Sequence, residues 1–160
     1  MSVALPNELL SLLRGGAVAI VGTRDGAMTP ELSRAWGLDV GEGRDEIELC
    51  VYARSGCRTL ANIADNGQIA VTITSPSTYR SFQVKGRVVS TCAVSATDLE
   101  RVSKHQQAFV DEVAAVGLPR DSAVRLFAAD IEADPEMRKI RVTVDLLFDQ
   151  TPGPGAGSRL

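Results

Sequence analysis

Polar and apolar side chains alternate most strictly in the segment "SFQVKGRV", which runs from Ser81 to Val88. Successive side chains of a β-strand point to opposite faces, so this segment predicts a strand with one apolar and one polar face. The apolar face consists of Phe82, Val84, Gly86 and Val88, and the polar face of Ser81, Gln83, Lys85 and Arg87. The polar face contacts either solvent or a bound anion that carries a flat organic body, and the alternation leaves both readings open.

Five other segments have the composition of strands. They are residues 17–23, about 33–40, 47–53, 68–74 and 139–149. In the third, Ile47, Leu49 and Val51 alternate with Glu48, Cys50 and Tyr52, which predicts a half-buried strand. In the last, one side is expected to consist of Ile140, Val142, Val144, Leu146 and Phe148.

The strand connections favour an antiparallel arrangement. A tight turn joins 68–74 to the alternating segment, and no long helix alternates with the strands as parallel βαβ units require. We therefore expect a mainly β (α+β) fold, a six-stranded antiparallel barrel with peripheral helices. A single domain at 1–150 is followed by a Gly/Pro-rich C-terminal tail at 151–160.

Apolar spacing and capping residues predict helices at 5–16, 57–65, 96–118 and 119–131. Ser55 is expected to cap the second helix and Asn66-Gly67 to end it, while Thr97 and Glu100 have the spacing of a capping box. The apolar face of the third helix is expected to contain Leu99, Val102, Phe109, Val113 and Val116. His105 lies near that face, and we interpret it as a surface or partly packed histidine rather than a catalytic one.

Composition excludes several classes of function. The 17 basic and 20 acidic residues give a net charge of −3, which disfavours a nucleic-acid-binding surface. No apolar stretch is long enough to cross a membrane and the first residues lack the pattern of a secretion signal, so we expect a cytoplasmic protein. One histidine and three scattered cysteines disfavour a Ser-His-Asp triad, a disulfide framework and a metal site.

The segment "CVYARSGCRTLANI" predicts a strand, a loop and then the start of a helix. A helix N-terminus carries unpaired amide donors and a partial positive charge, so anions bind there. The entrance adds the hydroxyls of Ser55 and Thr59 and the guanidinium of Arg58, which can bind two phosphate oxygens at once. The alternative is a capped helix with a solvated arginine. Cys57, at the same helix start, is either a redox-sensitive thiol or a small packed residue.

These segments resemble a known family. Tyr52, Arg58-Thr59, Asn66 and the later "RSFQVKGRV" look like the flavin core of the pyridoxamine-5′-phosphate oxidase-like proteins, over roughly residues 17–89. The tail "FDQTPGPGAG" also resembles the endings of small members of that group. The resemblance implies a homodimeric split β-barrel that binds FMN.

The resemblance also assigns roles to residues. It implies that Arg58 and Thr59 bind the FMN phosphate, and that Tyr52 and Ala53 lie along the cofactor. Ser81 and Gln83 would contact the isoalloxazine ring, together with Ser33, Arg34 and Trp36 on the first cofactor strand. The C-terminal Arg and His that hold pyridoxine phosphate in the true oxidase have no equivalent after Val142, and Thr59 replaces a lysine.

The implied function is that of an FMN-dependent oxidoreductase, which exchanges electrons with a small-molecule donor or acceptor at the flavin. Half of each cofactor pocket is expected to come from the partner subunit, with the apolar side of the helix at 97–116 and leftover strand surfaces at the two-fold interface. A non-catalytic sensor or carrier of flavin or haem, and a deazaflavin-dependent reductase, stay open as alternatives.

Overall fold

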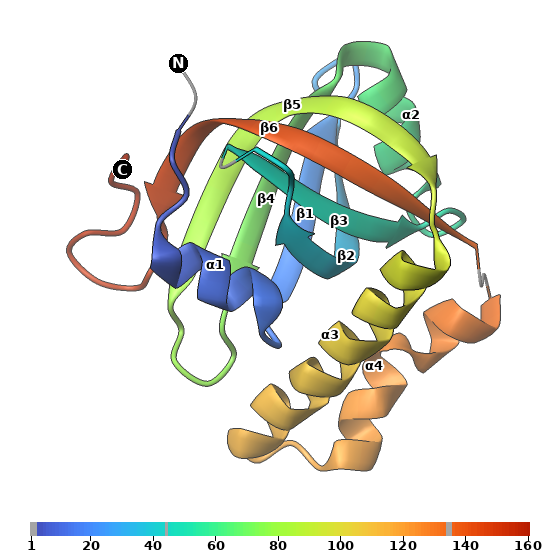
Figure 1. Cartoon of the computed structure of the whole chain (residues 1–160), viewed down its shortest axis with the longest axis vertical. Helices are drawn as coiled ribbons and strands as arrows, with labels where there is room; N and C mark the ends of the chain where they lie inside the picture. The colour runs from blue at the N-terminus through green and yellow to red at the C-terminus, as the bar shows by residue number, and fades with distance from the viewer. Residues whose placement is uncertain (1–2, 44, 134–135) are drawn as a thin grey trace.

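The structure is a computed structural model and describes residues 3–43, 45–133 and 136–160. Its elements follow the chain in the order α1 (Asn7–Arg14), β1 (Val18–Arg24), β2 (Pro30–Val40), β3 (Glu46–Tyr52), α2 (Cys57–Asn66), β4 (Gln68–Thr74), β5 (Ser81–Ala93), α3 (Ala96–Ala115), α4 (Arg120–Ala133) and β6 (Met137–Asp149). The six strands form a closed barrel in the order β1-β2-β3-β6-β5-β4, and all neighbours are antiparallel (Figure 1). The predicted six-stranded antiparallel barrel with peripheral helices is confirmed.

One hydrophobic cluster fills the barrel and another lies outside it. The inner cluster contains the inward side chains of all six strands, closed by Leu9 and Leu13 of α1 and by Ile63 of α2. These two helices lie at opposite ends of the barrel (Figure 1). The outer cluster, which includes Trp36 and Phe109, lies between the barrel wall and α3. The apolar side chains on the outer side of the wall are buried by α3, and this burial fixes where the helix packs.

The outer cluster corrects the prediction for β3. Ile47, Leu49 and Val51 point into the barrel as expected, but Cys50 and Tyr52 are also buried, because α3 covers the outer face of this strand. The strand is thus buried on both faces. Local alternation cannot show a helix that packs from a distant part of the chain.

A bulge corrects the prediction for β6. Lys85 pairs with Leu146 while Gly86 pairs with Val144, so Asp145 is an extra residue in β6. The extra residue reverses the alternation, because strand side chains have a period of two. Leu147 is therefore buried in the barrel, whereas Leu146 and Phe148 lie half-buried on the other face.

Two predicted helix caps were wrong. Gly56, not Ser55, precedes α2, and no side chain caps that helix. A Cβ on Gly56 would lie 2.7 Å from the Tyr52 carbonyl oxygen, so the turn leaves room for glycine alone. The capping box of α3 is formed by Ser95 and Asp98, two residues before the predicted pair. The predicted end of α2 is confirmed, with Gly67 at φ +67°.

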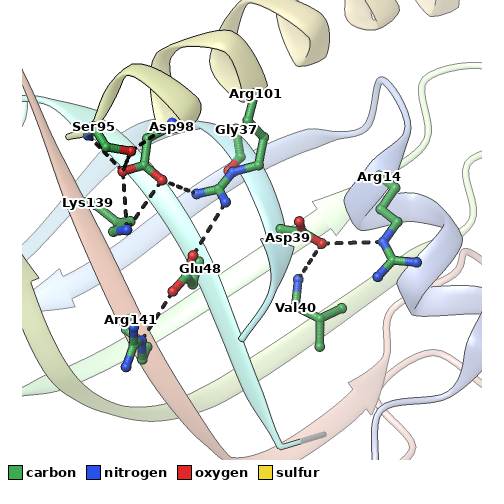
Figure 2. A network of polar contacts seen from close by, with 10 residues as sticks. All are labelled: Arg14, Gly37, Asp39, Val40, Glu48, Ser95, Asp98, Arg101, Lys139 and Arg141. Atoms are coloured by element: carbon green, nitrogen blue, oxygen red, sulfur yellow. Dashed lines mark hydrogen bonds and ion pairs between the residues drawn. The ribbon is translucent and has the colours of Figure 1, made fainter. Parts of the chain in front are cut away.

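A network of charges joins the start of α3 to the barrel (Figure 2). Asp98 is 3% exposed and accepts hydrogen bonds from Ser95, Arg101 and Lys139. Arg101 also reaches Glu48 on β3, and Arg141 on β6 donates to the same carboxylate. Because the carboxylates are largely buried, removing one partner would leave an uncompensated charge.

His105 lies in the interior rather than on the surface of α3. It is 5% exposed, its Nδ1 accepts a hydrogen bond from the Gly37 amide at 2.9 Å, and its Nε2 lies 2.8 Å from the Ala17 carbonyl. Since a carbonyl only accepts, the ring is the neutral Nε2–H form. Burial lowers the pKa of His105 to about 4; the hydrogen bond to the Ala17 carbonyl raises it in part, and the nearby Arg34 charge adds a smaller lowering effect.

The fold is expected to lose stability below neutral pH through this one histidine. Unfolding restores an ordinary pKa near 6.5, so the contribution of neutral His105 is complete above pH ~6.5 and is lost as the pH falls toward about 4. The loss is on the order of 3 kcal/mol in the free energy of unfolding, measured by urea denaturation across this range. His105→Gln keeps one donor and one acceptor without titrating, and an equal pH slope in both proteins would contradict the assignment.

Gly37 is expected to be costly to replace, because backbone strain and a close contact with α3 combine at this position. Its φ is +59° and a Cβ would lie 2.8 Å from Val102 Cγ2, whereas Gly67 has a similar φ with open space around it. Gly37→Ala should therefore lower the free energy of unfolding by about 2 kcal/mol or more, and Gly67→Ala by about 1 kcal/mol. Equal losses for the two variants in denaturant titrations would show that the Val102 contact adds no cost.

The tail at 151–160 returns to the barrel. The Leu160 amide donates to the Leu147 carbonyl and the Gly157 amide to the Asp149 carbonyl, beyond the last residue of β6 that pairs with β3. The Thr151 hydroxyl accepts a hydrogen bond from the Ser81 amide. The tail thus covers the start of β5.

Within residues 3–43, 45–133 and 136–160, no helix has the length and apolar character needed to cross a membrane.

Candidate functional site

The start of α2 presents an arginine at a helix end without a side-chain cap. The Arg58 side chain is 74% exposed, and its Nε lies 3.7 Å from a carboxylate oxygen of Glu31 on β2. The helix begins after Gly56 with no side-chain hydrogen bond to its first amides. An uncapped helix start is electropositive, and a loosely paired guanidinium beside it can turn toward an anion.

The hydroxyls predicted to join Arg58 have other partners. Thr59 is fully buried and its Oγ1 lies 2.6 Å from Ser33 Oγ, while the Asn62 side chain donates to the Thr23 hydroxyl. These bonds attach α2 to the end of the barrel and so hold Arg58 at its edge. Ser55 is exposed in the turn before the helix, and Cys57 is exposed at its first residue.

The aromatic residues of the predicted site lie under α3. Trp36 and Tyr52 are 1% and 4% exposed, and the Tyr52 hydroxyl accepts a hydrogen bond from Gln106. The guanidinium of Arg34 lies over the rings of Trp36 and Phe109, at 4.5 and 4.4 Å from their centres. Ala53 is half-buried just beyond Tyr52, and its amide donates to the Glu136 carbonyl.

Ser81 and Gln83 lie on the outer wall, at the other end of the barrel from α2. Ser81 pairs with Thr74 and Thr74 with Val18, whereas α2 contacts Thr23, five residues further along β1. Five residues of strand span about 17 Å. Gln83 donates to the Thr72 hydroxyl and Ser81 to the Tyr79 carbonyl. One chain therefore keeps the Arg58 and Ser81 parts of the predicted site well apart.

A groove on the same outer wall was missed by the site prediction. It has a volume of about 470 Å³ and is lined by β1, β4, β5 and the bulge of β6. Its cations are Arg24, Lys85 and Arg87, and none of the residues predicted to bind a cofactor lines it. The alternation of β5 did place Lys85 and Arg87 on the polar face with Ser81 and Gln83. Only the barrel register brings Arg24 to them.

Comparison with solved structures shows the same fold in other proteins. An F420 reductase superposes with a TM-score of 0.58 at 17% identity, over 89% of this chain and 98% of its own. HupZ from Group A Streptococcus gives 0.54 at 16% identity, over 96% and 99%. A proposed pyridoxamine 5′-phosphate oxidase from Lactobacillus delbrueckii gives 0.54 at 9% identity, over 91% and 93%.

Sequence comparisons add no closer relative. No protein-family model matches the chain, and no curated protein matches it. The low identities of the structural matches show the fold alone. The barrel thus has the split-barrel fold of the pyridoxamine-5′-phosphate oxidase-like proteins, which is the fold that the sequence resemblance implied.

Proposed function

We propose that this protein is a homodimeric flavin-dependent oxidoreductase whose cofactor, FMN, is held by Arg58 through its phosphate. The observation that carries the proposal is the exposed Arg58 guanidinium at the uncapped start of α2. The split-barrel fold, shared with an F420 reductase and a proposed pyridoxamine 5′-phosphate oxidase, supports a cofactor of the flavin type.

The residues at the start of α2 fit a phosphate group. Arg58 meets Glu31 at only 3.7 Å and is largely exposed, so a phosphate can replace this weak contact with two charge-assisted hydrogen bonds. The Ser33–Thr59 bond fixes the helix that carries Arg58. Thr59 is completely buried and would act by positioning rather than by direct contact.

The separation of the predicted contacts supports a site built from two copies of the chain. Arg58 and Ser81 lie at opposite ends of one barrel, as the β1 register shows. In the proposed dimer, Arg58 of one copy holds the phosphate and Gln83 of the other contacts the ring, while Ser81, which is 5% exposed, supports that strand through its bonds to Thr74 and Tyr79. On the apolar side of α3, Val102, Phe109 and Val113 are buried within the chain, and Leu99 and Val116 near its two ends are exposed. Exposed strand residues such as Leu32, which is 68% exposed, are therefore the proposed dimer surface.

The chain's own residues suit a cofactor that performs the redox step. Bound flavin accepts or donates two electrons as a hydride equivalent, and the protein supplies binding and orientation. The sole histidine is buried with both ring nitrogens in hydrogen bonds, so it is not placed to move a proton at a surface site. Gln83 would orient the ring through its side-chain amide, and the buried Ser81 would hold the start of β5 in place.

A deazaflavin is the second candidate cofactor, because an F420 reductase has this fold and its match covers 89% of this chain. Its phosphate would use the same Arg58 position. A haem carrier is less well supported. Both nitrogens of His105 are engaged with Gly37 and Ala17, so this histidine offers no free axial ligand.

Arg58→Ala is expected to weaken FMN binding at least about tenfold, because a charge-assisted bond to the phosphate is lost. The titration follows flavin fluorescence on mixing with purified protein, and coenzyme F420 is titrated in parallel. Arg125→Ala removes an exposed arginine of α4 and serves as the control. Unchanged affinity of Arg58→Ala for both cofactors would refute the phosphate assignment.

Reduction of the bound flavin tests turnover. Bleaching of bound flavin by NADH or NADPH would support turnover, and a bound flavin that is never reduced would favour a carrier.

A further inference from the structure

The groove on the outer wall has the construction of a small-molecule site. Its volume of about 470 Å³ falls within the range of ligand pockets. Gly22, Ala70 and Leu146 form an apolar floor on three different strands. Gly22 borders open space on this floor. A Cβ at this position would make only ordinary contacts, with the Leu32 side chain at 3.6 Å and the Ala70 carbonyl at 3.9 Å.

Three cations surround this floor without carboxylate partners. Among the residues that the structure describes, no carboxylate lies within ion-pair distance of Arg24, Lys85 or Arg87. By contrast, Arg58, Arg80, Arg101 and Arg141 each have a carboxylate within 4 Å. Asp145 is the one acidic residue of the lining, so the groove has a net charge of +2 in a protein of net charge −3.

Neighbouring groups contact two of these cations, Arg24 and Lys85. Arg24 donates to the Gln68 side chain at 2.9 Å and to the Asp25 carbonyl at 3.2 Å, both of which are neutral acceptors. The ammonium of Lys85 lies 5.1 Å from the centre of the Phe148 ring. Arg24 is therefore pre-oriented while its charge stays uncompensated, as suits recognition of an anion.

We propose that this groove is a second binding site, for a small organic anion with a flat or compact apolar body. The anionic head, a phosphate or a carboxylate, is bound by Arg24, Lys85 and Arg87. The apolar body lies on the floor of Gly22, Ala70 and Leu146. The site is distinct from the proposed flavin phosphate site, since Arg58 does not line the groove.

The test titrates ¹⁵N-labelled full-length protein with phenyl phosphate, benzoate and phenol, and follows the backbone amide shifts by NMR. Phenyl phosphate and benzoate, which combine charge with a flat body, should shift the amides of Gly22, Ala70, Lys85 and Gly86. Phenol lacks the charge and should bind at least about tenfold more weakly. The two anions separate a phosphate ligand from a carboxylate ligand by their relative affinities.

Two variants remove different parts of the site. Lys85→Gln with Arg87→Gln removes two charges and should weaken phenyl phosphate at least about tenfold. Gly22→Val fills the floor and leaves every cation in place, so it should also abolish the shifts. Lys104→Gln with Arg125→Gln, two exposed residues outside the groove, removes the same two charges and should bind normally.

Three results would overturn the proposal. The first is the absence of probe-dependent shifts at the groove amides, and the second is equal affinity in the charge variant and its control. The third is that the amide shifts of the groove change with protein concentration and not with the probes, which would make the groove an interface between copies of the chain. The flavin titration is a separate measurement. If the groove variants lose FMN binding while Arg58→Ala retains it, the groove is the flavin site. That result would refute both the Arg58 phosphate assignment and the proposal of a second site.

Discussion

The position of α3 depends on one buried imidazole. His105 joins two segments of the barrel, since it accepts from the Gly37 amide on β2 and donates to the Ala17 carbonyl before β1. These bonds satisfy backbone groups that α3 would otherwise bury without partners, which is costly in an apolar setting. Gly37 lies at a bulge in β2, where a left-handed residue without a side chain lets the helix approach closely.

The location of α3 determines which parts of the barrel can meet a ligand. The helix buries Trp36 and Tyr52, and its charged network with Glu48 closes that side of the wall. Beyond Val18, which packs against the outer cluster, the outer faces of β1, β4 and β5 line the groove, and Arg58 at the α2 entrance is also exposed. Both proposed sites lie on these uncovered surfaces, and both have arginine as the principal cation.

Local sequence predicted the elements well because their signals are local. Alternation identified β5, and Asn66-Gly67 marked the end of α2 where a left-handed glycine terminates the helix. The errors came from interactions between distant residues. The burial of Tyr52 depends on α3, the phase of β6 on an extra Asp145, and the role of His105 on backbone groups of Gly37 and Ala17. The groove was missed because Arg24 meets Lys85 and Arg87 only through barrel register.

The most direct test of the account is a mixture of two variants, Arg58→Ala and the double variant Ser81→Ala with Gln83→Ala. Each alone should bind FMN poorly. If every site takes Arg58 from one copy and Ser81 and Gln83 from the other, unfolding and refolding the two together should restore about a quarter of the wild-type sites in mixed dimers. Fluorescence titration of the mixture measures this recovery. No recovery, in a mixture shown by mass spectrometry to contain mixed dimers, would contradict a site shared between two chains.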